Sequence, residues 1–137
     1  MDGAVSDPGQ LLRGLRPVLH PGVQVFATVP RREDAEGLAF LASFQEEEGL
    51  TLVLEEGEAA RAGLEPLFRA AWITLTVHSA LEAVGLTAAV AAALARESIA
   101  CNVIAAARHD HLFVPVDRAQ DALRVLAGLA EGAGTDG

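Results

Sequence analysis

The fold is decided by the stretch WITLTVHSALEAVGLTAAVAAALARESIACNVIAAARHDHLFVPV, residues 72–116, in which the hydrophobic period changes from that of a strand to that of a helix and back. WITLTVH (72–78) alternates apolar and polar side chains, which predicts a strand. LTAAVAAALARES (86–98) has apolar residues at helical spacing and is rich in alanine, which predicts a helix. IACNVIAAA (99–107) and HLFVPV (111–116) alternate again around a polar turn, which predicts a hairpin.

A second helix is expected after this stretch. Asp117 and Gln120 are spaced like a capping box, and an apolar stripe continues from them to Leu129. The Gly-rich segment that follows is predicted to be disordered. A βαββαβ unit needs one more strand after its second helix. We therefore expect the segment PVLH at 17–20, or a strand of the first half, to complete the sheet.

The first half begins less regularly. A short helix is predicted over residues 11–19, where it runs into Pro17. VQVFATV at 23–29 then alternates like a strand. Pro30 and the charged residues after it end this strand.

A hairpin is the favoured interpretation of the next segment. Residues 38–48 suit either a helix or a strand, whereas GLTLVL at 49–54 is rich in strand formers. We therefore place a turn near Glu48 and Gly49. A short helix is expected at 58–64, before Pro66.

The order of these elements suggests two modules built on one plan. We place the first module at residues 11–69 and the second at residues 70–130. Residues 1–10 and 131–137 are expected to be disordered ends. A chain of 137 residues with 51% hydrophobic content is long enough for one ordinary domain or for two very small modules that share a core.

A family resemblance rests on two parts of this sequence. EEEGLTLVLEE at 46–56 and the whole stretch at 72–116 resemble small bacterial proteins made of two tandem ACT modules. The resemblance implies an α+β fold of two ferredoxin-like (βαββαβ) modules that share antiparallel sheets, the first one irregular because segment 30–37 replaces the usual helix. It also implies a homodimer that binds an amino acid or related metabolite and regulates a target enzyme.

The loop before the helix at 86–98 is the candidate ligand site. Gly85 lets the backbone approach a ligand closely, and a helix N-terminus offers free N–H groups to a carboxylate. Glu82 is a candidate partner for an α-amino group. Ser79 is a further candidate residue of this loop. The resemblance implies a pocket lined by Val84, Gly85, Leu86 and Thr87, and faced by Cys101, Asn102 and Val103 of a neighbouring module.

A purely structural interpretation of the same loop stays open. Gly85 would then only permit a turn, and Thr87 would cap the helix. Ser79 and Glu82 would form a local capping box.

Composition and charge argue against several classes of partner. Ten basic against nineteen acidic residues leave a net charge of −9, which disfavours binding to nucleic acid. No long apolar run and no signal-peptide pattern is present, so we expect neither a membrane partner nor export. The single cysteine, Cys101, fits a cytoplasmic protein.

Metal binding and catalysis have weaker support. His109 and His111, with His78, could form a metal site, but a polar turn is the simpler interpretation. Neither Ser79 nor Ser98 lies in a nucleophile motif, and Cys101 lies in an apolar strand. We therefore predict no catalytic residue, metal or cofactor, and expect a ligand-binding regulator. A module that binds only other proteins is the alternative, and a small histidine enzyme comes last.

Overall fold

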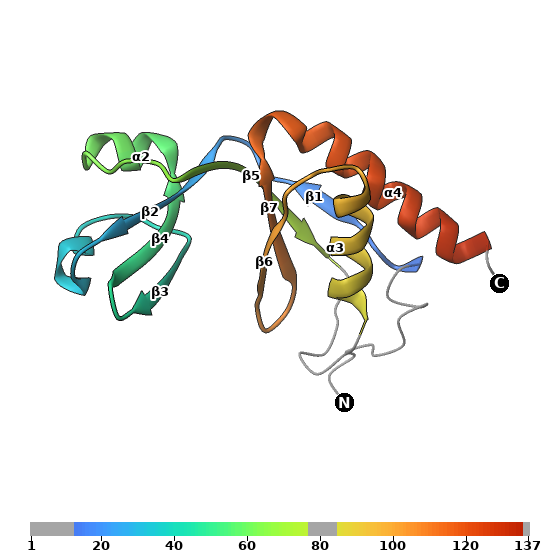
Figure 1. Ribbon diagram of the computed structural model, residues 1–137, viewed down its shortest axis with the longest axis horizontal. Coiled ribbons are helices and arrows are strands. Elements are labelled where there is room, and N and C mark those ends of the chain that lie inside the picture. The colour runs from blue at the N-terminus through green and yellow to red at the C-terminus, as the bar shows by residue number, and fades with distance from the viewer. Residues whose placement is uncertain (1–12, 77–84, 136–137) are drawn as a thin grey trace. The chain divides into compact units, whose positions relative to one another are not determined.

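The computed structural model describes residues 13–76 and 85–135, the side chains of 132–135 excepted (Figure 1). The chain divides into two compact units. The small unit comprises residues 21–70, and the large unit comprises residues 1–20 and 71–137. The units differ from the predicted modules 11–69 and 70–130 in that the described residues 13–20 lie in the large unit. The predicted disorder of residues 1–10 lies outside the described residues.

The small unit is an antiparallel sheet with short helices. Its strands lie in the order β3-β4-β2-β5, and β5 contributes only its first residues here. The elements are β2 (Gln24–Val29), η1 (Arg32–Ala35), β3 (Ala42–Glu46), β4 (Gly49–Glu55), α2 (Glu56–Arg61) and β5 (Phe68–Leu75). The predicted hairpin is confirmed, because Glu46 pairs with Gly49 across the turn.

Gly49 is required at this turn for a steric reason. Its φ is +151°, and a Cβ atom at this position would lie 2.6 Å from the carbonyl oxygen of Val29. Helix α2 begins two residues earlier than predicted, at Glu56, whose N–H bonds to the carbonyl oxygen of Val23. It ends three residues early, where Gly63 adopts a φ of +71°.

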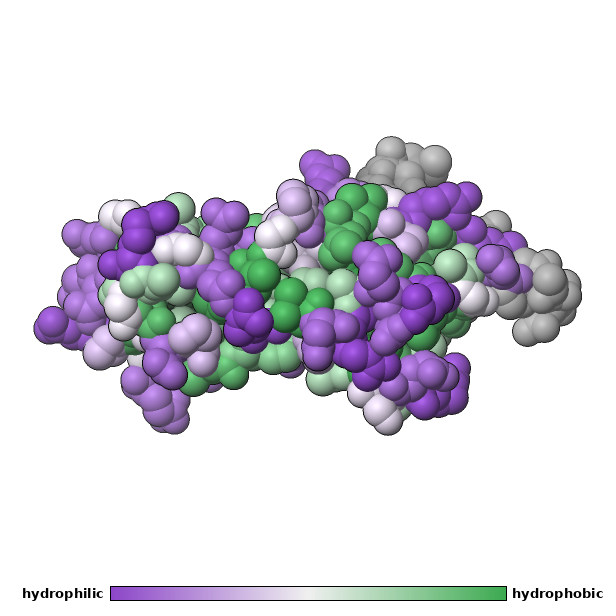
Figure 2. Space-filling view, turned by 90° about the horizontal axis from the view of Figure 1, so that it is seen from above, coloured by the Kyte–Doolittle hydropathy of each residue, from purple (hydrophilic) through white to green (hydrophobic). Residues whose placement is uncertain are grey.

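One face of the small sheet packs on its helices and the other does not. Val25, Ala27 and Val29 alternate into a cluster with Leu52 and Ala59. Large apolar side chains also remain at the surface: Phe44 is 73% exposed and Leu67 is 67% exposed. In Figure 2 apolar surface (green) appears among the hydrophilic surface (purple).

The large unit combines a sheet with two helices. Its strands lie in the order β1-β5-β7-β6, in which β1 is antiparallel to β5 and β6 is antiparallel to β7. The elements are β1 (Pro17–Leu19), the end of β5, α3 (Leu86–Arg96), β6 (Asn102–Ala105), β7 (Asp110–Pro115), η2 (Val116–Arg118) and α4 (Ala119–Thr135).

The strand that the second half lacks is supplied by residues 17–19. Pro17 lies opposite Leu75 and Leu19 lies opposite Ile73, so the PVLH segment completes the sheet. The helix predicted over residues 11–19 is therefore wrong in its last part, while residues 11–12 lie outside the description. Pro17 has no N–H for a helix and is tolerated on an edge strand, where pairing with β5 decides the conformation.

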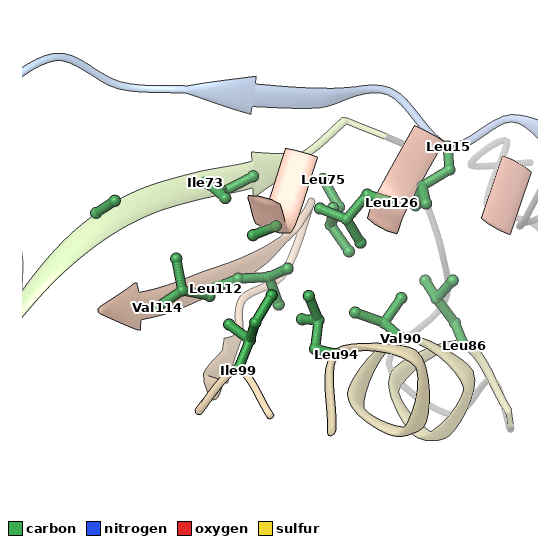
Figure 3. Close-up of a cluster of buried hydrophobic side chains, with 12 residues drawn as sticks. Leu15, Ile73, Leu75, Leu86, Val90, Leu94, Ile99, Leu112, Val114 and Leu126 are labelled. Atoms are coloured by element: carbon green, nitrogen blue, oxygen red, sulfur yellow. The ribbon is translucent and has the colours of Figure 1, made fainter. Parts of the chain in front are cut away.

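The core of the large unit lies between the sheet and both helices. Figure 3 shows Ile73, Leu75, Leu112 and Val114 of the strands directed toward residues of α3 and α4. The buried residues of α3 are Leu86, Val90, Ala93 and Leu94, at the helical spacing that predicted this helix. The predicted α+β class is confirmed.

The last helix differs from its prediction at both ends. Asp117 lies inside η2, because a 3-10 turn precedes α4, so it does not occupy the predicted capping position. Helix α4 continues to Thr135, whereas a disordered tail was expected from Glu131. Extending an existing helix adds one hydrogen bond for each residue that it orders, which favours continuation after Ala130.

Candidate functional site

Gly85 starts helix α3 in a conformation that other residues rarely adopt. It is the N-cap residue with a φ of 107°, and its carbonyl oxygen accepts the N–H of Ala89 at 2.9 Å. Within the described residues no side chain caps this helix. The first N–H groups of α3 therefore have no capping side chain there, which is the arrangement that binds anions at helix N-termini.

The other predicted loop residues fall into three groups. Leu86 is buried in the core of the large unit. Thr87 is exposed in the first turn, and because Gly85 holds the N-cap position, the interpretation of Thr87 as the cap is wrong. Ser79, Glu82 and Val84 lie outside the described residues.

The second part of the predicted pocket lies beyond the other end of α3. Cys101 and Val103 pack against the hydrophobic core, and Asn102 is exposed at the start of β6. Helix α3 has 11 residues, so it is roughly 16 Å long and separates Gly85 from Cys101. That Cys101, Asn102 and Val103 of a neighbouring module face Gly85 remains a prediction.

Cys101 has the properties of a packing residue. Burial raises the pKa of its thiol to about 11. The thiol therefore stays protonated at neutral pH and is a weak nucleophile. This agrees with the interpretation of Cys101 as a core or pocket residue.

A polar cluster that sequence reasoning missed lies on the sheet of the large unit. Trp72 and Thr74 alternate with the core residue Ile73, so they lie on the face away from the helices. Thr74 Oγ1 lies 2.7 Å from His20 Nε2 and 3.0 Å from His111 Nδ1. The ring of His20 stacks on Trp72, with ring centroids 3.6 Å apart.

Hydrogen bonding assigns the protonation state of His111. The indole N–H of Trp72 can only donate, and it lies 3.1 Å from His111 Nδ1. His111 Nδ1 must then accept, so the imidazole is neutral. Burial is the main cause that lowers the pKa of His111, followed by the charges of His109 and His20, while Asp110 opposes them. Burial also lowers the pKa of His20.

Among the described residues, His109 and His111 do not gather with other metal ligands as the metal interpretation requires. The Nδ1 of His111 is engaged by Trp72 and Thr74, and that of His109 is buried without a partner. Across the described part of the chain, no three His, Cys, Asp or Glu side chains gather as metal ligands. His78 lies outside it.

Comparisons with known families cover nearly the whole chain. Residues 5–71 and residues 68–128 each match a family model described as ACT domain. No curated protein sequence matches the chain. Among the described residues, no helix is both long and apolar enough to cross a membrane.

Three solved structures with this fold cover most of the chain. A Vibrio cholerae protein of unknown function, described as a possible transport protein, is 50% identical, with a TM-score of 0.81 over 89% of this chain and 94% of that one. An Agrobacterium tumefaciens protein is 17% identical, with a TM-score of 0.66 over 85% and 89%. The regulatory subunit of aspartate kinase from Thermus thermophilus is 12% identical, with a TM-score of 0.66 over 84% and 98%. The predicted pair of ferredoxin-like modules is confirmed.

Proposed function

This chain belongs to the ACT domain family, with two ACT domains in tandem, and we propose that it is a regulatory protein that binds an amino acid or related metabolite at the loop before α3. The observation that supports this proposal is the conformation of Gly85. This N-cap residue of α3 has a φ of 107°, and no described side chain caps the helix. An α-carboxylate accepts hydrogen bonds from such N–H groups and is favoured by the helix dipole.

The proposed pocket needs two modules. The ligand's carboxylate lies at Gly85 and Thr87 of one module, and Asn102 of another module faces it. Asn102 is exposed at the start of β6, so it is free to contact a second copy of the chain. Glu82 binds the α-amino group. The ligand thereby links two chains, and a homodimer is the proposed active form.

Regulation follows from linkage between the ligand and the assembly. A ligand shifts an equilibrium between two arrangements only by the difference in its affinities for them. The solved regulatory subunits of aspartate kinase share this fold, which supports a regulatory and non-catalytic role. The proposed target is an enzyme on a separate chain. The proposed compartment is the cytoplasm, where Cys101 stays reduced.

A thermal-shift screen of the purified protein against the twenty amino acids tests this proposal. A ligand at a concentration of one hundred times its dissociation constant should raise the free energy of unfolding by about 2.7 kcal/mol. The variant Glu82→Gln should lose this response, and the matched control Glu131→Gln, an exposed residue of α4, should keep it. A flat response to every amino acid, or equal responses of both variants, would refute amino-acid binding at this loop.

A module that binds only another protein is the second candidate. The observation that favours it is the apolar surface of the small unit, with Phe44 73% exposed and Leu67 67% exposed. Under this proposal, Phe44→Ser abolishes binding of the target protein, and Glu82→Gln leaves that binding unchanged. The opposite pattern rejects it.

A further inference from the structure

The small unit holds a pocket that is separate from the loop before α3. Its volume is about 230 Å³. It is lined by Gln24, Ala39, Phe40, Leu41, Glu55 and Glu58. We infer that this pocket binds a small primary amine that carries a short aliphatic chain and no carboxylate.

Gln24 supplies an unused hydrogen-bonding group. Gln24 is only 7% exposed, and its Oε1 atom is buried without a hydrogen-bond partner. Such an atom lowers the stability of the fold, so a ligand N–H that reaches the amide removes a cost already present. Gln24 lines the pocket, so an ammonium bound there is placed to donate a hydrogen bond to Oε1.

The charge of the pocket selects a cation. Glu58 Oε2 accepts the N–H of Ala39 at 3.0 Å, and Glu58 also pairs with Arg61. These contacts, first the Ala39 N–H and then Arg61, lower the pKa of Glu58 and keep it ionised. Glu55 lies directly opposite Gln24 in the sheet, and in the described structure its carboxylate makes no ion pair. Because Arg61 already offsets the charge of Glu58, the carboxylate of Glu55 is the group that attracts an ammonium and repels a free carboxylate.

The remaining wall is apolar and held in place. Phe40 and Leu41 are 43% and 40% exposed, so their side chains are available to an aliphatic chain. The N–H of Leu41 bonds to the carbonyl oxygen of Val53 at 2.7 Å, and Glu58 holds Ala39, so both ends of segment 39–41 are anchored. With a volume of about 230 Å³, the pocket has room for several water-sized groups. That is enough for isopentylamine.

The test is an NMR titration of the full chain with isopentylamine and, separately, with leucine. Leucine keeps the same branched chain and the amino group but adds the α-carboxylate. The amine should shift the side-chain amide of Gln24 and the backbone amides of Ala39 and Leu41 saturably, and leucine should not shift them. Glu55→Gln should weaken amine binding about fivefold, as expected for a partly exposed ionic contact. The exposed Glu65→Gln, which makes the same change in charge outside the pocket, should not.

A second variant separates binding from folding. Gln24→Met keeps the shape of the side chain but removes the unpartnered oxygen, so it should melt at the same temperature as the parent or higher. It should also weaken amine binding. The proposal would be overturned if the folded Gln24→Met variant bound the amine as tightly as the parent. It would also be overturned if leucine shifted Gln24, Ala39 and Leu41 as much as the amine does, or if the amine caused no saturable shift. Shifts caused by leucine at Gly85 and Leu86 report only on the proposed amino-acid site, so the two proposals succeed or fail independently.

Discussion

The indole N–H of Trp72 lies 3.1 Å from Nδ1 of His111 and donates to it, so the native fold selects the neutral form of this histidine. Thr74 connects the same nitrogen to His20. Protonation of His111 would place a second N–H against the indole donor. The cluster therefore links the protonation of two histidines to the packing of the sole tryptophan.

Acidification should destabilise this cluster. The folded-state pKa values of His111 and His20 both lie below the ordinary value of 6.5. The contribution of the neutral histidines to the free energy of unfolding is therefore complete above pH 6.5, and it is lost as the pH falls through the lowered pKa values. The loss should amount to about one hydrogen bond, ~1 kcal/mol. Urea unfolding followed by Trp72 fluorescence, at a series of pH values from neutral to mildly acidic, measures it.

The variant His111→Asn is the control for this titration. Asparagine keeps an acceptor near the position of Nδ1 but does not titrate. Its stability should therefore depend less on pH. Asp110 should act in the opposite direction to His111. Burial raises the pKa of its carboxyl group, so protonation of Asp110 on acidification favours the folded state. A parent and a variant with the same pH dependence would contradict the role of His111.

Gly49→Ala should destabilise the small unit. The new Cβ atom would lie 2.6 Å from the carbonyl oxygen of Val29, so the backbone of the hairpin must shift. We expect a loss of about 1–3 kcal/mol in the free energy of unfolding, the usual cost of local backbone strain. Gly128→Ala, in α4 with open space at the Cβ position, should instead stabilise by up to ~1 kcal/mol. Thermal denaturation of both variants decides whether they change stability in opposite directions.

Leu126→Ala should be strongly destabilising. Leu126 is fully buried between the helices and the sheet of the large unit, so truncation leaves a cavity (Figure 3). The expected loss is about 2–5 kcal/mol in urea denaturation. Leu67→Ala, at a side chain that is 67% exposed, serves as the matched control and should change stability by less than about 1 kcal/mol. Similar losses in both variants would count against the core assigned to the large unit.

A fragment of residues 70–137 should not fold cooperatively. It lacks β1, so strand β5 loses the backbone bonds of His20 to Trp72 and of Thr76 to Arg16. It also lacks Leu15, which is buried in the core of the large unit. Circular dichroism during heating should show a broad, weak transition. A sharp transition near that of the full chain would mean that the first twenty residues are dispensable.

The sequence predicted the local structure well where hydrophobic periodicity is strong. The alternation around Ile73 and the helical stripe from Leu86 to Leu94 both appear in the structure, and the β3-β4 hairpin turns at the predicted place. These patterns are local, because each element must turn its apolar side chains to one face. The ends of elements were less predictable, since η2 and the extension of α4 depend on neighbouring turns.

The proposed ligand loop remains a prediction from sequence, and the structure adds the conformation of Gly85 and the exposure of Thr87 and Asn102. Neither the cluster around His111 nor the pocket around Gln24 could be found from sequence. The first needs the pairing of three strands that bring His20, Thr74 and His111 together, and the second needs segment 39–41 to lie beside β4.

By itself the sequence determined most of the strands and helices, which face of each is apolar, and that the chain is acidic with a single cysteine. Only the tertiary structure decided that residues 17–19 pair with β5, that His111 accepts from Trp72, and that Gln24 is buried without a partner. The physical reason is the range of the interactions. Periodicity records the burial of neighbours along the chain, whereas strand partners and hydrogen-bonded side chains are set by contacts between residues far apart in sequence.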